Sequence, residues 1–134
     1  MRNKLKTCLI ALSVAVSGLT AMAAAASFPE KTITIINPYD PGGNADLQAR
    51  FVAEFMEKDL GVTVNVESRS GGSGAIGMSY IKAARPNGYI IGLTAVGPAL
   101  VSPNRINTGY NTTTDYTPIA QITNSPYTLS EHKS

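Results

Sequence analysis

The sequence predicts an α/β fold with a parallel sheet. An Ile- and Thr-rich run at residues 31–37 and alternating valines at 62–66 have the composition of strands. An apolar run at 89–94 suggests a third, buried strand. Helical segments follow the first two runs after turns rich in Gly and Pro. Because strand, helix and strand alternate along the chain, the expected strands are parallel and joined by helical crossovers.

The first helix is expected at residues 45–59. Asn44 has the side chain of an N-cap, and Gly61 is suited to end the helix. Asp46 falls in the first turn, where a negative charge is favoured by the helix dipole. Apolar residues recur at helical spacing and form one stripe, the kind of face that packs on a sheet. These residues are Leu47, Phe51, Val52, Phe55, Met56 and Leu60.

A second glycine-rich loop at 70–74 leads into a shorter helix at 75–84, which ends before Pro86. After the third strand, Gly97 and Pro98 begin a loop and a short helix that reaches about Val101. Residues 102–117 are polar and are expected to form a long surface connection. The pattern predicts a fourth strand at 119–123 and the start of another element near Tyr127.

The amino terminus has the pattern of a secretory signal. Arg2, Lys4 and Lys6 precede an apolar stretch at 9–19 that is short for a membrane span. Small residues follow, and cleavage is expected between Ala23 and Ala26; an uncleaved anchor is the alternative. The expected domains are a signal peptide at 1–26 and one folded part at 27–134. The chain is therefore expected in the periplasm.

Charge and cysteine content narrow the function classes. The chain has 11 basic and 9 acidic side chains, and three of the basic ones lie in the expected leader. The remainder is close to neutral and has no basic run, which argues against nucleic acid as a partner. Cys8 is the sole cysteine, so removal of the leader would leave no thiol and no disulfide.

The turn at 38–43 suggests an anion site. It joins a strand directly to a helix, and the first N–H groups of a helix lack intrahelical acceptors and lie at the positive end of the dipole. The second strand–glycine–helix unit, at 62–77, repeats this arrangement. Two such loops in an exported chain favour a receptor for a small acid.

Competing site chemistries have less support. Residues 72–77 fit G-x-G-x-x-G, but no acidic residue follows at the spacing a dinucleotide site requires. Close approach of the backbone to a ligand or a neighbouring helix explains these glycines better. Asp40, Asp46 and Glu67 are too scattered for an acid/base pair and are read as caps and solvated charges. The sequence predicts no metal, cofactor or catalytic residue.

Four ordered segments carry a family resemblance. They are Phe28-Pro29-Glu30-Lys31 with Pro41-Gly42-Gly43 and Asp46, Glu67-Ser68-Arg69 with 71–77, Ala84-Arg85-Pro86-Asn87-Gly88-Tyr89, and Tyr110 with Asp115-Tyr116-Thr117-Pro118-Ile119. Together they resemble the substrate-binding proteins of tripartite tricarboxylate transporters, the Bug family. Ser68 stands where the family usually has Asn, and Asn87 where it has Asp. The match covers residues 28–129.

The resemblance implies a type II periplasmic binding fold with two lobes that close on a carboxylate, of which residues 27–134 would form part of the first. It also implies delivery to a permease with one large and one small membrane subunit. Backbone N–H groups of both loops would hold the carboxylate, so a side chain at Gly43 would block the ligand or demand an unfavourable φ. The ligand-binding residues expected are Tyr39, Pro41, Gly42, Gly43, Asn44, Ala45 and Asp46, then Ser70, Gly71, Gly72, Ser73 and Gly74, and finally Thr94 and Gly97.

Within that loop, Asp46 is expected to anchor the helix start, since a carboxylate should not face the ligand's carboxylate directly. Because family members are longer, the chain is interpreted as a truncated form that binds weakly. An exported α/β enzyme acting on organic acids is the alternative function. An exported sensory module is a third possibility that the sequence does not separate from transport.

Overall fold

The computed structural model describes residues 27–124 of the chain. The chain divides into two units, residues 1–30 and 31–134, and the elements named here all belong to residues 31–124. The expected signal peptide, its cleavage site and the element near Tyr127 lie outside the described residues. None of the helices described is long and apolar enough to cross a membrane.

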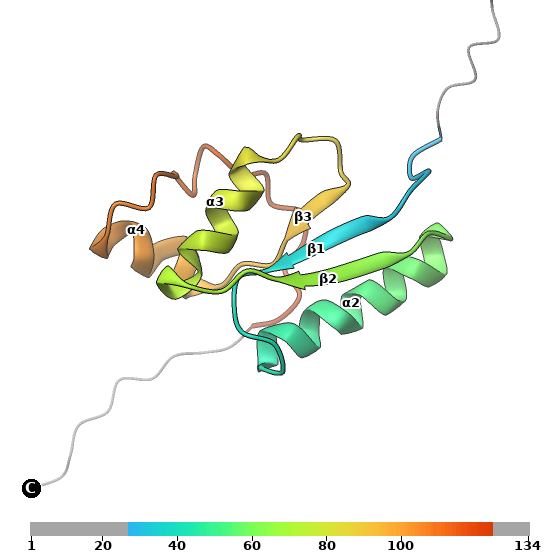
Figure 1. Ribbon diagram of the computed structural model, residues 1–134, viewed down its shortest axis with the longest axis horizontal. Helices are drawn as coiled ribbons and strands as arrows, with labels where there is room; N and C mark the ends of the chain where they lie inside the picture. Colours follow the sequence, from blue (N-terminus) through green and yellow to red (C-terminus); the bar gives the residue numbers. More distant parts are fainter. Residues whose placement is uncertain (1–26, 125–134) are drawn as a thin grey trace, which may run out of the picture. The chain divides into compact units, whose positions relative to one another are not determined.

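A parallel sheet of three strands forms the centre of this unit (Figure 1). Strands β1 (Ile33–Asn37), β2 (Val64–Ser68) and β3 (Ile90–Gly92) lie in the order β2-β1-β3, and Ile35 is paired with both Val66 and Ile91. The predicted parallel α/β arrangement is confirmed. Strand β3 is shorter than expected and only half-buried, because β1 is its one neighbour within the described sheet.

Helices α2 (Asn44–Leu60) and α3 (Ala75–Ala83) cover opposite faces of the sheet (Figure 1). The chain moves from β1 to β2 in one direction across the sheet and from β2 past β1 to β3 in the other. Right-handed crossovers in opposite directions place their helices on opposite faces. The helix prediction is confirmed within one residue at either end of each helix.

The face of α2 that packs on the sheet differs from the predicted apolar stripe. Ala49 and Ala53 are buried against Ile33, Ile35 and Val64 in the core, and Val52 and Met56 pack beside them. Leu47, Phe51 and Phe55 are each more than half exposed, so the stripe as predicted is wrong. Small alanines let the helix lie close to the sheet.

The ends of α2 follow the prediction at one terminus only. Gly61 ends the helix with φ +67°, and its N–H donates to Glu57 O at 3.0 Å, as expected for a C-terminal glycine. At the other end the N-cap residue is Gly43, and Asn44 is the first helical residue. The Asn44 side chain accepts a hydrogen bond from Gln48 Nε2 at 3.2 Å instead of capping the helix.

The short helix expected after Gly97 is present and continues. A π-helical turn η2 (Gly97–Val101) runs into α4 (Ser102–Arg105), and residues 106–124 have no regular secondary structure. The predicted strand at 119–123 is therefore wrong: Ile119 is 80% exposed and no strand of the described sheet adjoins it. Strand-forming composition does not make a strand without a neighbour to pair with.

Residues 102–117 are more than a surface connection. Tyr110 is 7% exposed and its hydroxyl donates to Pro98 O at 2.7 Å. The Tyr116 hydroxyl donates to Met78 O at 2.8 Å, and the two tyrosine rings meet edge to face with centroids 5.8 Å apart. Together with Ala75 and Met78 they form the second core cluster, on the α3 side of the sheet.

Replacing Tyr110 with phenylalanine should lower the free energy of unfolding by about 1 kcal/mol, because the buried carbonyl of Pro98 loses its donor. Burial also raises the pKa of the Tyr110 hydroxyl, so this hydroxyl is protonated and able to donate at neutral pH. Urea unfolding of the two proteins checks the value. An unchanged midpoint would show that the bond contributes nothing to stability.

Candidate ligand-binding edge of the sheet

The carboxyl ends of the three strands meet at one edge of the sheet. Loop 1 (residues 38–43), loop 2 (69–74) and loop 3 (93–96) leave β1, β2 and β3 there and lead to α2, α3 and η2 (Figure 1). Ligands of open α/β sheets bind outside the carboxyl ends of the strands. The structure thus brings all three expected groups of site residues to one edge.

Loop 1, loop 2 and η2 are in contact, and glycines make this possible. A Cβ atom on Gly74 would lie 2.8 Å from Pro98 Cβ and 3.3 Å from Pro38 Cβ. A Cβ atom on Gly97 would lie 3.0 Å from the Tyr39 hydroxyl. Loop 2 therefore touches loop 1 and η2, and Tyr39 of loop 1 reaches the start of η2. Close approach accounts for Gly74, whereas Gly71 and Gly72 have φ values of +122° and +56° that residues with a side chain rarely adopt.

Helix α2 offers unpartnered donors at this edge. Among the described residues, the N–H groups of Asn44, Ala45 and Asp46 have no acceptor, and the first backbone bond of the helix is that from Leu47 N–H to Gly43 O at 3.1 Å. Pro41, Gly42, Gly43 and Asn44 are exposed. Free N–H groups at the positive end of a helix dipole can bind an oxyanion.

Asp46 lies beneath this helix start. It is 3% exposed, and its Oδ2 accepts hydrogen bonds from Arg50 Nε at 2.9 Å and from Gly42 N–H at 3.0 Å. Arg50, followed by the Gly42 N–H, holds the pKa of the Asp46 carboxyl below its usual range. The group is thus ionised at neutral pH with its charge balanced by Arg50. This geometry is that of an anchor for loop 1.

Loop 2 presents its donors differently from the expectation. The N–H groups of Gly74 and Ile76 bond to Gly71 O, and that of Ala75 bonds to Gly72 O. The helix-start amides of α3 are therefore already occupied within their own loop. Exposed residues earlier in loop 2 remain available to a ligand; they are Ser70, Gly71, Gly72 and Ser73.

Loop 2 is also held by hydrogen bonds from Ser102, a residue that sequence reasoning missed. Ser102 is 2% exposed, and its hydroxyl lies 3.2 Å from Ser73 O and 3.4 Å from Gly72 O. Ser73 has φ +53°, a backbone conformation that non-glycine residues rarely adopt. The sequence around Ser102 gives no local signal that this serine, rather than another polar residue of 102–117, would be buried and bonded to loop 2.

Thr94 of loop 3 is exposed, and Gly97 at the start of η2 is half-buried beside Tyr39.

Asn37 is a second buried polar residue at this edge that sequence reasoning missed. It is the last residue of β1 and is fully buried. Its Oδ1 accepts from Tyr39 N–H at 3.1 Å, and its Nδ2 donates to Ser68 Oγ at 3.1 Å. The dipeptide Asn37-Pro38 after an apolar strand is a turn signal that could have identified it.

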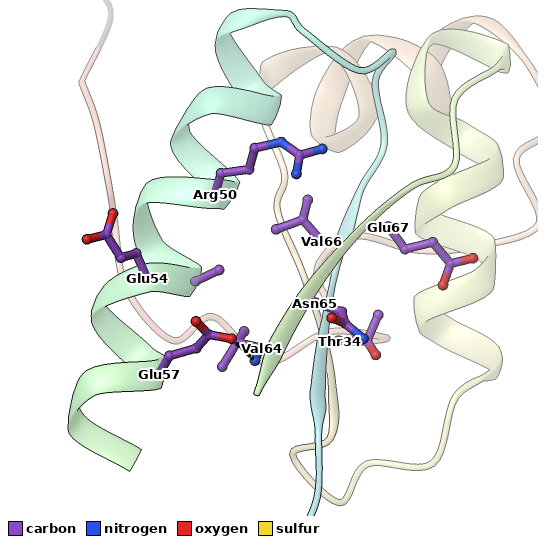
Figure 2. A pocket seen from close by; sticks show the side chains of 9 residues that line it. Thr34, Arg50, Glu54, Glu57, Val64, Asn65, Val66 and Glu67 are labelled. Carbon is purple, nitrogen blue, oxygen red and sulfur yellow. Dashed lines mark hydrogen bonds between the residues drawn. The ribbon is translucent and has the colours of Figure 1, made fainter. Parts of the chain in front are cut away.

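A cavity of about 550 Å³ lies elsewhere, between α2 and the outer edge of β2 (Figure 2). Figure 2 shows Arg50 and Glu57 reaching from α2 toward the strand, and Glu57 Oε1 accepts from Val64 N–H at 2.8 Å. Glu54 pairs with Lys58 and Glu67 with Arg69. The acidic groups that line this cavity thus have partners in the chain, and none of the expected site residues lines it.

Relatives of known sequence support the resemblance seen in the motifs. Residues 48–132 match the model of the tripartite tricarboxylate transporter family receptor. A UPF0065 protein of Agrobacterium vitis is 35% identical over 103 residues, which are 77% of this chain and 30% of that protein. Protein BugT of Bordetella pertussis is 29% identical over 126 residues, 90% of this chain and 37% of that protein. The chain spans about a third of the length of these relatives.

Solved structures agree with the fold. The periplasmic binding protein BugD is 36% identical with a TM-score of 0.60, over 69% of this chain and 31% of that one. An R. palustris protein solved with adipate is 30% identical with a TM-score of 0.52, over 53% and 24% of the two chains. By sequence and by fold, the chain belongs to the tripartite tricarboxylate transporter receptor family.

Proposed function

We propose that the chain is part of a periplasmic receptor that captures a small di- or tricarboxylate, or a related organic acid, for a tripartite transporter. The observation that carries this proposal is the row of unpartnered N–H groups at Asn44, Ala45 and Asp46, at the edge of the sheet where three loops converge. Family membership supports the class of function. The adipate in the R. palustris relative supports an organic acid as the ligand class.

In this proposal the ligand is held mainly by backbone. One carboxylate of the ligand accepts hydrogen bonds from the helix-start amides of α2, where the dipole favours negative charge. Asp46 does not repel it strongly, because Arg50 balances the Asp46 charge. Tyr39, Thr94, Gly97 and the exposed residues of loop 2 surround the same edge and complete the site from this lobe.

Family membership supports the proposed localisation and partner. The expected leader at 1–26 would export the chain to the periplasm, where the related BugD is a binding protein. The partner proposed is the membrane permease with one large and one small subunit. Relatives of this family are receptors, so the proposed activity is binding and release of an unchanged ligand.

The chain expressed without its leader should bind adipate or citrate with a dissociation constant in the millimolar range. The described donors lie on one sheet edge. A two-lobed receptor would add several charge-assisted hydrogen bonds from an opposing lobe, and losing them at about 1.5–3 kcal/mol each changes a micromolar dissociation constant to a millimolar one. Titration followed by amide chemical shifts checks this, and the largest changes are expected at residues 42–46.

The diamide of adipic acid is the matched control, because it keeps the length of the acid and lacks the charge. Equal binding of acid and diamide, or acid-induced shifts confined to residues far from the loops, would contradict the proposal. Submicromolar binding by the chain would overturn the expected weakness and show that one lobe carries the whole site. Acid recovered chemically changed would favour an enzyme.

A further inference from the structure

We propose that Asn37 is a positioning residue for the carboxylate site, one that fixes loop 1 and ties it to the strand from which loop 2 leaves. This inference rests on the proposed function, since the effect claimed is on ligand affinity. It concerns a residue that does not touch the expected ligand. Asn37 acts through the backbone of loop 1 and through Ser68.

The Asn37 amide uses both of its ends. The oxygen accepts from Tyr39 N–H and the nitrogen donates to Ser68 Oγ, both at 3.1 Å. Because Asn37 is fully buried, leaving either end without a partner would be costly. The planar amide therefore fixes the start of loop 1 relative to the end of β2, across 31 residues of sequence.

The hydrogen bond from Tyr39 N–H to Asn37 Oδ1 positions the rest of loop 1. With its backbone fixed, Tyr39 reaches the start of η2, where its hydroxyl would lie 3.0 Å from a Cβ atom on Gly97. At the other end of the loop, Asp46 accepts from Gly42 N–H at 3.0 Å. Loop 1 is thus held at both ends from below by buried polar side chains. Donors held in place before binding cost less to order when the ligand arrives.

The experiment compares three variants of the leaderless chain: Asn37→Ala, Ser68→Ala and the control Asn87→Ala. Asn87 Oδ1 accepts from Tyr89 N–H at 3.2 Å, the same kind of bond as that between Asn37 and Tyr39. It lies in the turn before β3, at the amino end of that strand and away from the site. The probe is adipate, followed by amide shifts, and urea unfolding gives the stability of each variant.

Asn37→Ala should weaken adipate binding by about three- to tenfold, the equivalent of losing the net contribution of one hydrogen bond. Ser68→Ala should weaken adipate binding less than Asn37→Ala does. It should also change the amide chemical shifts of residues in both loop 1 and loop 2. Asn87→Ala should leave the dissociation constant unchanged although it also loses stability. If Asn37→Ala does not fold, the comparison of Ser68→Ala with Asn87→Ala decides.

The outcomes separate the two claims. If the unaltered chain does not bind adipate more tightly than its diamide, the proposed function fails and the inference fails with it. A second outcome is that the unaltered chain binds adipate and that Asn37→Ala and Ser68→Ala bind it as tightly as the unaltered chain does. In that case the inference alone is overturned. The same holds if Asn87→Ala weakens binding as much as they do, because the effect would then be general destabilisation.

Discussion

Gly77→Val should destabilise the fold severely. Gly77 is buried in α3, and a Cβ atom on it would lie 2.9 Å from both Pro38 Cα and Pro38 Cβ and 3.0 Å from Arg69 O. Two of these atoms are backbone, so the clash can be relieved only by moving α3 away from loop 1 and loop 2. The sequence predicts close approach to a ligand or a neighbouring helix, whereas the neighbours are Pro38 of loop 1 and Arg69 of loop 2.

Two effects compete at this position. In a helix, alanine is favoured over glycine by about 1 kcal/mol. Overpacking against atoms that cannot move costs about 1–3 kcal/mol for small additions. Gly77→Ala adds the same Cβ atom, so it should lower the free energy of unfolding by up to about 2 kcal/mol. Gly77→Val should remove a large part of the roughly 5–15 kcal/mol that is typical of a whole domain.

Urea unfolding of both variants measures the effect. Gly43→Ala is the control, because a Cβ atom there meets only Asp40 O, at 3.7 Å. A Gly77→Val protein as stable as the unaltered chain would show that α3 is not held against Pro38 as the structure has it.

Gly43→Val should abolish carboxylate binding and leave the melting temperature nearly unchanged. Gly43 has φ −80° and ψ 175°, which valine adopts readily, so the expected backbone strain at this residue is wrong. The expected loss of binding therefore has a steric cause. A branched side chain at the N-cap would cover the free N–H groups of α2 and keep the ligand carboxylate from reaching them. The positive φ, +80°, belongs to Gly42.

The neighbouring glycine gives a matched contrast. Gly42→Val should lower the free energy of unfolding by about 1–2 kcal/mol, the cost of a left-handed backbone for a residue with a side chain. Asp46→Asn should reduce stability through loss of the Arg50 ion pair but largely keep binding, because the amide oxygen can still accept from Gly42 N–H. Adipate titrations and thermal melts of the three variants provide the comparison.

Normal binding by Gly43→Val, together with loss of binding and intact stability in Asp46→Asn, would contradict the assignment. In that case the Asp46 carboxylate, and not the backbone of α2, would be the ligand contact.

The stability that Asp46 contributes should decrease below the ordinary pKa of a carboxyl group. The folded-state pKa of Asp46 is lowered, so protonation occurs below the ordinary value and removes the ion pair with Arg50. Thermal melts of the unaltered chain and Asp46→Asn should converge as the pH falls.

The sequence by itself determined the local elements. Period-two valines predicted β2, helical spacing predicted α2 and α3, and Gly61 predicted the end of α2, because these features depend on residues close in the chain. The order of the elements was sufficient for a parallel sheet. It also placed the three loops at one edge, since parallel strands with helical crossovers end on the same side.

Tertiary structure decided what depends on distant partners. It buried the alanine face of α2 instead of the larger side chains, and left residues 119–123 without a strand because no neighbour in the described sheet pairs with them. It also occupied the helix-start amides of α3. It gave the buried side chains of Asn37 and Ser102 their hydrogen-bond partners. Burial and hydrogen-bond partners come from residues far apart in sequence, and a local pattern carries no information about which of them will meet.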